Sequence, residues 1–80
     1  MRVMRFYTTA GCRLCDEALQ WVNPIMMRLK VNLEVVDIMS EKTLESAYGE
    51  HIPVLEWSHS GDTLVWPFDR ASVYRFGMHP

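Results

Sequence analysis

The fold is decided by the stretch VMRFYTTAGCRLC, which covers residues 3–15. Its first five residues include Val, Phe and Tyr and predict a buried strand. The small residues at 8–11 end that strand in a turn, and over residues 13–30 apolar side chains recur every three or four positions, as on one face of an amphipathic helix. The two cysteines therefore lie where a strand ends and a helix begins.

The segment LEVVDI, residues 33–38, predicts a second strand, and its Val and Ile content is typical of a strand covered on both faces. A short helix follows, with Ser40 as its N-cap and Gly49 as its stop. Its apolar stripe consists of Leu44, Ala47 and Tyr48.

A hairpin and a final helix complete the sequence. Residues 52–57 and 63–66 predict two strands joined by a polar loop with Gly-Asp turn chemistry. Pro67 fits the first turn of a last helix that ends at Gly77. The order βαβαββα predicts one α/β domain over residues 1–80, with a parallel β-α-β opening and a four-stranded mixed sheet flanked by helices.

Charge and hydropathy exclude several classes of protein. The chain has 8 basic and 10 acidic residues, a formal net charge of −2, and its bases are spread without a cluster. This distribution leaves no electrostatic footprint for nucleic acid or an anionic membrane surface. No apolar run has the length of a membrane span or a signal peptide, so we expect a cytoplasmic protein. Two cysteines are also too few for a disulfide-stapled secreted domain.

Cys12 and Cys15 have the spacing and the position of a redox dithiol. In the first turn of a helix, Cα atoms three residues apart fall within disulfide reach. Cys12 faces unpaired backbone N–H groups and the positive end of the helix dipole, both of which favour a thiolate. Arg13 supports that charge and the acidic residues at 16 and 17 oppose it, but at exposed positions these effects are small. We therefore assign Cys12 as the nucleophile and Cys15 as the resolving thiol.

Two other interpretations of the pair stay open. A CxxC is half of a zinc site, but the remaining candidate ligands, His51, His59 and His79, lack the spacing of a knuckle, and we expect no metal. The pair could also be two buried structural cysteines, which Gly11 and the strand-to-helix position disfavour.

The chain resembles the thioredoxin fold, and most closely its glutaredoxin branch. The resemblance is carried by TAGC at 9–12, LCDEA at 14–18, IPVL at 52–55 and WPFD at 66–69. This set is similar to that of short bacterial glutaredoxin-like proteins whose functions are largely unassigned, and it covers nearly the whole chain.

The resemblance implies roles for the residues that match the family's motifs. Cys12 and Cys15 match the dithiol, and Pro53 matches the cis-proline that lies against it. The backbone of Ile52 would pair with an extended substrate segment.

The neighbours of the cysteines complete the implied substrate site. Thr9 and Gly11 would shape the loop before the nucleophile. Arg13-Leu14 stands between the cysteines, where glutaredoxins usually have a proline. The chain also lacks the Gly-Gly pair that precedes the glutathione-holding segment in glutaredoxins, and VWPFD at 65–69 occupies that region.

Four further residues are weaker candidates. Tyr7 and Trp66 could line a substrate groove, although strand-end aromatics in a small domain are more often core. His51 could donate a proton to the dithiol, against the plainer interpretation of an exposed loop histidine. Asp69 could help to bind glutathione, but a carboxylate at a helix start has a sufficient structural reason to be there.

These observations predict a thiol-disulfide oxidoreductase that binds no cofactor and acts as a monomer. Cys12 would attack a disulfide-containing protein or a glutathione mixed disulfide, and Cys15 would resolve the intermediate. Glutathione, or a reductase such as thioredoxin reductase, would then reduce the oxidised protein. The alternative is a non-catalytic redox-sensing or protein-binding module, in which the disulfide switches affinity for a partner.

Overall fold

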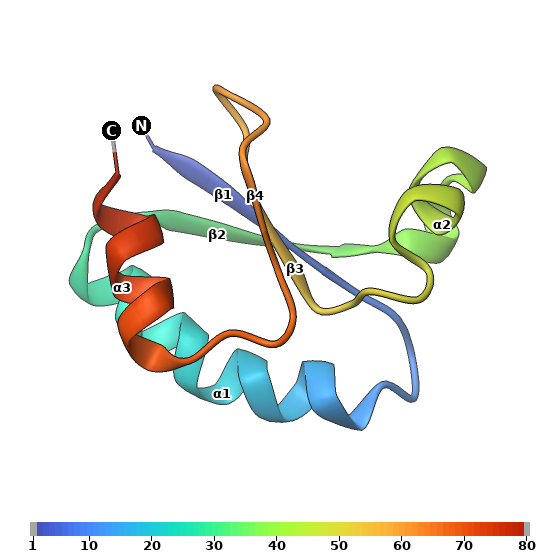
Figure 1. Cartoon of the computed structure of the whole chain (residues 1–80), viewed down its shortest axis with the longest axis horizontal. Coiled ribbons are helices and arrows are strands. Elements are labelled where there is room, and N and C mark those ends of the chain that lie inside the picture. The colour runs from blue at the N-terminus through green and yellow to red at the C-terminus, as the bar shows by residue number, and fades with distance from the viewer. Residues whose placement is uncertain (1, 80) are drawn as a thin grey trace.

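The structure is a computed structural model that describes residues 2–79, and a four-stranded sheet of order β2-β1-β3-β4 forms its centre (Figure 1). The strands and helices are β1 (Val3–Thr8), α1 (Arg13–Arg28), β2 (Asn32–Asp37), the 3-10 turn η1 (Ile38–Ser40), α2 (Lys42–Tyr48), β3 (Val54–Trp57), β4 (Thr63–Val65) and α3 (Arg70–Met78). This order confirms the predicted α/β class and the βαβαββα arrangement of a thioredoxin-like fold.

The sheet is mixed, as predicted. β1 pairs in parallel with β2 and antiparallel with β3, and β3 pairs antiparallel with β4. α1 and α3 lie together on one side of the sheet, whereas α2 lies beyond one end of it (Figure 1). The dithiol segment connects β1 to α1, and this topology makes that connection part of the parallel crossover.

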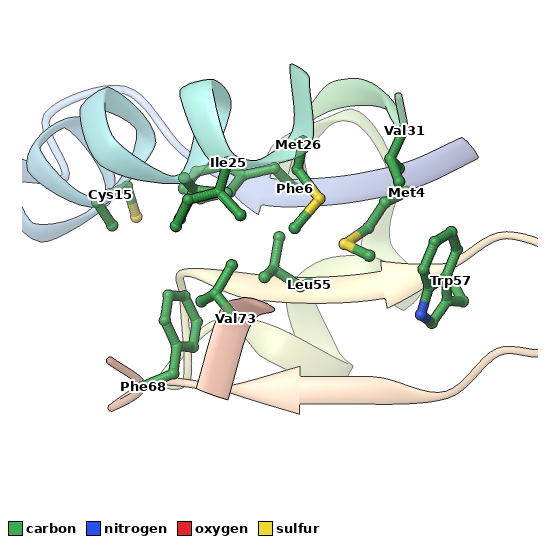
Figure 2. Close-up of a cluster of buried hydrophobic side chains, with 12 residues drawn as sticks. Met4, Phe6, Cys15, Ile25, Met26, Val31, Leu55, Trp57, Phe68 and Val73 are labelled. Atoms are coloured by element: carbon green, nitrogen blue, oxygen red, sulfur yellow. The ribbon is translucent and has the colours of Figure 1, made fainter. Parts of the chain in front are cut away.

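The principal core fills the space between the sheet and the pair α1 and α3. Because side chains alternate along a strand, Met4 and Phe6 of β1 and Leu55 and Trp57 of β3 all enter this core. α1 contributes its apolar stripe and continues through Pro24 without a break. The core forms a row in Figure 2, with Cys15 at one end and Trp57 at the other.

A smaller cluster forms on the opposite face of the sheet, where Tyr7, Ile38 and Val54 are buried. Leu44 and Tyr48 of α2 pack against it, but α2 itself buries no residue. The predicted apolar stripe was therefore wrong for Ala47, which is exposed, because this helix touches the sheet only near its end.

The prediction that the second strand is covered on both faces was also wrong. β2 is an edge strand, and none of its residues is fully buried. Val35 shares a face with Phe6 through the parallel register, yet it is 54% exposed. Helices α1 and α3 cover the middle of that face and leave the edge open.

Two helix starts differ from the prediction. Asp37 accepts a hydrogen bond from Met39 N at 2.9 Å and begins η1, which includes Ser40, so that the N-cap of α2 is Glu41. Asp69 is the N-cap of α3, which leaves Pro67 outside the helix rather than in its first turn.

The last helix also ends later than predicted: α3 continues through Gly77 to Met78. Gly77 is buried at the contact between α3 and α1, and a Cβ atom there would lie 2.7 Å from Cδ1 of Leu29 and 3.2 Å from Cε of Met26. This glycine permits close packing of two helices rather than a left-handed stop. Gly49 ends α2 as predicted, although in a right-handed conformation.

Candidate functional site

Three connections meet at one end of the sheet. Tyr7 pairs with Val54, and Val54 pairs with Val65, so the residues that follow β1, precede β3 and follow β4 are neighbours. The backbone N–H of Trp66 donates to Pro53 O at 3.2 Å and closes this end of the β3–β4 hairpin. The sheet register therefore brings the dithiol loop, Pro53 and Trp66 to the same end of the sheet.

Cys12 and Cys15 form a disulfide across the first turn of α1, with their Cα atoms 5.2 Å apart. Cys12 is the N-cap, and its Sγ accepts a hydrogen bond from the backbone N–H of Cys15 at 3.1 Å. Cys12 is partly exposed, whereas Cys15 is completely buried and points into the principal core (Figure 2). Only the first cysteine of the pair is accessible to a second molecule.

This arrangement can support thiol chemistry at Cys12. In the reduced protein a sulfur at the N-cap receives a backbone N–H and the positive end of the α1 dipole, and both stabilise a negative charge. Cys15 lies within bonding distance of Cys12 but not at the surface. It can therefore attack a disulfide that Cys12 has formed, but it cannot meet a bulky substrate first.

The loop before Cys12 requires a glycine. Gly11 has φ +82°, a left-handed conformation that other residues adopt only at a cost, and a Cβ there would meet no atom within 4 Å. Thr9 contributes its carbonyl, which accepts a hydrogen bond from Cys12 N at 3.3 Å. Arg13 is the first residue of α1, and its exposed side chain forms no ion pair within residues 2–79.

Pro53 is fully buried, and the Ile52–Pro53 peptide bond is cis, as is Trp66–Pro67. Ile52 packs against both hydrophobic clusters. Its backbone N–H and C=O pair with no other backbone group of the described chain. A partly buried residue at a strand entry thus presents an unused donor and acceptor next to the dithiol end of the sheet.

The structure places Tyr7 away from the dithiol. Its ring stacks on Tyr48 with the ring centroids 4.8 Å apart, and its hydroxyl donates to Oε1 of Glu56 at 2.6 Å. Burial, followed by the hydrogen bond to the Glu56 carboxylate, raises the pKa of Tyr7 to about 12. Tyr7 therefore belongs to the small cluster on the α2 side of the sheet.

The other weaker candidates take different positions. His51 is exposed in the turn after α2, and its backbone N–H donates to Tyr48 O at 2.8 Å. Asp69 caps α3, where hydrogen bonds from the hydroxyl and then the backbone N–H of Ser72 hold the pKa of its carboxyl below the usual value. Trp66 is partly buried and meets Phe68 edge-on at 5.1 Å between ring centroids.

Two features did not emerge from the sequence. Glu56 accepts hydrogen bonds from Tyr7, Tyr48 and Arg5. A row of aromatic rings also runs from Trp66 through Phe68 to Trp21. Strand alternation could have placed Glu56 beside Tyr7, but no local pattern indicates that α1 and the segment before α3 bring these rings together.

Within residues 2–79, no group of three or more His, Cys, Asp or Glu side chains could hold a metal ion. None of the helices described here combines the length and the apolar character of a membrane span.

The βαβαββα fold and the CxxC disulfide at the start of α1 define a glutaredoxin-like protein. The chain belongs to the family described as Glutaredoxin-like domain (DUF836), which matches residues 3–76. No curated protein matches the chain.

Two solved structures are similar over most of their length. Protein XcR50 from X. campestris is 31% identical, with a TM-score of 0.73, and the match covers 91% of this chain and 92% of that one. Protein Ne2328 from Nitrosomonas europaea is 25% identical, with a TM-score of 0.77, and the match covers 94% and 88%.

Proposed function

We propose that the protein is a thiol-disulfide oxidoreductase whose reaction begins at Cys12. The observation that carries this proposal is the asymmetry of the Cys12–Cys15 disulfide at the N-terminus of α1. Cys12 is partly exposed and its sulfur receives a backbone N–H, whereas Cys15 is buried within bonding distance of it. A nucleophile and a resolving thiol need this division of exposure.

In the reaction, the Cys12 thiolate attacks a substrate disulfide, forms a mixed disulfide and releases one substrate thiolate, which takes up a proton. The Cys15 thiolate then attacks Cys12 Sγ and releases the second substrate thiolate. The substrate gains two electrons and two protons, and the protein is left with the Cys12–Cys15 disulfide. Two further thiols, from glutathione or from a dithiol reductase, return the protein to its reduced form.

The unpaired peptide groups of Ile52 support a substrate that binds in extended form. A strand-like segment laid beside Ile52 would satisfy both groups and bring a neighbouring disulfide toward Cys12, which is the β-augmentation mode of recognition. We propose that a disulfide-containing protein or a glutathione mixed disulfide is bound in this way by a monomer without a bound cofactor.

Single-turnover reduction of a small disulfide by the pre-reduced protein tests the proposal. We expect Cys12→Ser to abolish the reaction, because the buried Cys15 cannot reach the substrate. Cys15→Ser should still form the mixed disulfide at Cys12 and accumulate it, with a mass increase equal to half of the substrate. Turnover with glutathione and with thioredoxin reductase then identifies the electron donor.

The outcomes separate the enzyme from the sensing or binding module. Unchanged turnover by Cys12→Ser would overturn the assignment of the nucleophile. If the wild type reduces no disulfide, and a Cys12→Ser/Cys15→Ser double variant still captures a partner, the module without turnover is the better description.

A further inference from the structure

A groove lies between α1 and α3 on the flank of the molecule, at a distance from the dithiol. It has a volume of about 300 Å³, the lower end of the range for ligand pockets. Its lining includes Trp21 and Arg28 from α1 and Arg70 and Tyr74 from α3. The groove therefore combines an apolar wall with cationic and hydroxyl groups from both helices.

The positive charge of the groove is not neutralised by the protein itself. Arg28 and Arg70 are exposed, and neither forms an ion pair with a carboxylate in residues 2–79. The guanidinium of Arg70 lies over the ring of Trp21, 5.3 Å from its centroid. Glu17, one helical turn before Trp21, makes no ion pair with either arginine. A carboxylate from another molecule would meet two cations without displacing an internal partner.

Tyr74 adds a hydrogen-bond donor. Nη1 of Arg28 donates to the Tyr74 hydroxyl oxygen at 3.3 Å, so that the hydroxyl acts as an acceptor toward the arginine and keeps its own proton for a further acceptor. A carboxylate near this pair can accept from the guanidinium and from the phenol at once, and hydrogen bonds to an ionised acceptor are the stronger kind.

A row of aromatic rings connects the groove with the dithiol end of the sheet. Trp66 is held to Pro53 by a backbone hydrogen bond and contacts Phe68, which meets Trp21 edge-on with the ring centroids 5.9 Å apart. Along α1, two residues of the groove, Trp21 and Arg28, lie six and thirteen residues after Cys15. At about 1.5 Å per residue, these offsets correspond to roughly 9 and 20 Å.

We propose that this groove binds an acidic segment of the substrate protein, located about three to six residues from the cysteine that Cys12 attacks. An extended chain advances about 3.3 Å per residue, so roughly three to six residues span the distance from the dithiol to the groove. The acidic side chain pairs with Arg28 and Arg70, and the residues between lie along the partly exposed rings of Trp66 and Trp21, which the buried Phe68 joins. The inference rests on the proposed function and adds a rule of substrate choice to it.

Four decapeptides, a Glu and a Gln version for each direction along the peptide, test the rule. Each contains one cysteine as a mixed disulfide with 5-thio-2-nitrobenzoate, and they carry either Glu or Gln at the fourth and fifth positions from that cysteine, in versions on its N-terminal and its C-terminal side. Pre-reduced protein releases the coloured thiol when Cys12 bonds to the peptide sulfur. We expect the Glu peptide of one direction to react roughly fivefold faster than its Gln partner, as two partly exposed ion pairs allow, and this preference should fall with added salt.

Charge-matched variants assign the preference to the groove. Arg28→Gln/Arg70→Gln should react with the Glu and Gln peptides at equal rates. Lys30→Gln/Arg75→Gln, which removes the same charge outside the groove, should keep the preference, and Arg28→Lys/Arg70→Lys should restore part of it. A preference that survives in Arg28→Gln/Arg70→Gln, or that is absent from the wild type, overturns the inference and leaves the oxidoreductase intact. Failure of the wild type to react with any peptide overturns both.

Binding without chemistry provides a second readout. In ¹⁵N NMR spectra of the oxidised protein, a Glu peptide with serine in place of its cysteine should shift the indole N–H of Trp21 and the Nε–H of Arg28 and Arg70, and the Gln peptide should not. Equal shifts with glutathione or inorganic phosphate would show a general anion site and overturn the assignment to an acidic segment.

Discussion

Among single residues, Tyr7 shows how a polar group can be buried within a small domain. It is only 4% exposed, and its hydroxyl donates to the Glu56 carboxylate. The same carboxylate forms an ion pair with Arg5 and accepts a longer hydrogen bond, 3.4 Å, from the Tyr48 hydroxyl. The folded protein holds the neutral phenol, because burial disfavours the charged form and because ionisation would place a second negative charge beside the carboxylate. Tyr7 therefore stabilises the fold only while it is protonated.

The sign of the pH dependence follows from the pKa of Tyr7, about 12 in the folded protein against 10 in the unfolded chain. Its contribution is fully present below pH 10 and is lost as the pH rises from 10 to 12, a change of about 2–3 kcal/mol. Tyr7→Phe should therefore cost roughly 1.5–3 kcal/mol at pH 8, and the difference from the wild type should shrink toward pH 12. Urea unfolding at each pH measures this.

Tyr48→Phe is the matched control for that series. Its hydroxyl bond to Glu56 is longer, so we expect the same direction with a smaller loss. A wild-type advantage over Tyr7→Phe that stays constant up to pH 12 would contradict the linkage between the Tyr7 proton and the fold.

Gly11 is the second position where one residue determines local structure. Its φ of +82° costs an alanine roughly 1–2 kcal/mol, while the open space around it adds no steric cost. We expect Gly11→Ala to lower the free energy of unfolding by about that amount, and Gly11→Asn to cost less, since asparagine tolerates the left-handed region better. If Gly11→Ala and Gly11→Asn lose the same stability in thermal unfolding, an effect of the added side chain, rather than the backbone conformation, accounts for the loss.

At the scale of elements, α3 depends on Asp69 for its start. The carboxylate Oδ1 accepts from Ser72 N at 2.8 Å and from the Ser72 hydroxyl at 2.7 Å. Asp69→Ala should lower the midpoint of urea unfolding at pH 7. Asp69→Asn should lower it much less, because aspartate and asparagine can both cap a helix.

Acid tests the contribution of the Asp69 charge, which the wild type has and Asp69→Asn lacks. The pKa of Asp69 is below its usual value in the folded protein, so the charge-dependent part of its contribution is present above pH 4 and is lost as the pH falls through the lowered pKa. The wild type should thus lose its advantage over Asp69→Asn in acid. If Asp69→Ala instead slows disulfide reduction and leaves stability unchanged, Asp69 acts at the substrate site rather than as a cap.

The elements that sequence reasoning placed well are those whose signals are local. The strand, turn, CxxC and amphipathic helix over residues 3–30 follow from local sequence signals. α1 buries Ala18, Val22 and Ile25 of the predicted stripe, whereas Leu14 at its start is 49% exposed. The exposure of β2 was not predictable in this way, because it depends on which strand lies at the sheet edge. Ser40 lost the N-cap position because Asp37 formed a cap three residues earlier.

In the candidate site, too, the residues in local motifs were predictable and those brought together by tertiary packing were not. Cys12, Cys15 and Pro53 stand in recognisable motifs, and the sheet register brings their loops to one end. The groove depends on how α3 packs against α1, and the contact of Trp21 with Phe68 joins residues that are far apart in the sequence. Periodicity within one helix contains no information about such a contact.

At the scale of the whole molecule, Arg2 joins the entry of β1 to the end of α3. Its Nη2 donates to Gly77 O at 2.6 Å, across 75 positions of sequence, and its guanidinium lies 4.9 Å from the ring centroid of Trp57. Trp57 donates in turn to Phe76 O at 2.9 Å. The carbonyls in the last turn of a helix have no i+4 partner within it. The bond from Arg2 satisfies Gly77 O, which would otherwise depend on water, and Trp57 adds a second donor to Phe76 O, which also accepts from His79 N at 3.3 Å.

We expect Arg2→Ala to lower the free energy of unfolding by about 1–2 kcal/mol, since it removes a bond from a charged donor, a cation–π contact and a positive charge at a helix C-terminus. Arg2→Lys should lose less, because it keeps the charge but not the planar stack. Arg75→Ala removes a charge from the same end of α3 without a bond to a carbonyl, and should change stability by less than about 0.5 kcal/mol. Urea unfolding of the oxidised proteins measures all three. If Arg2→Ala costs no more than Arg75→Ala, general charge at the helix end accounts for the effect, and α3 is held by its apolar contacts with α1 and the sheet alone.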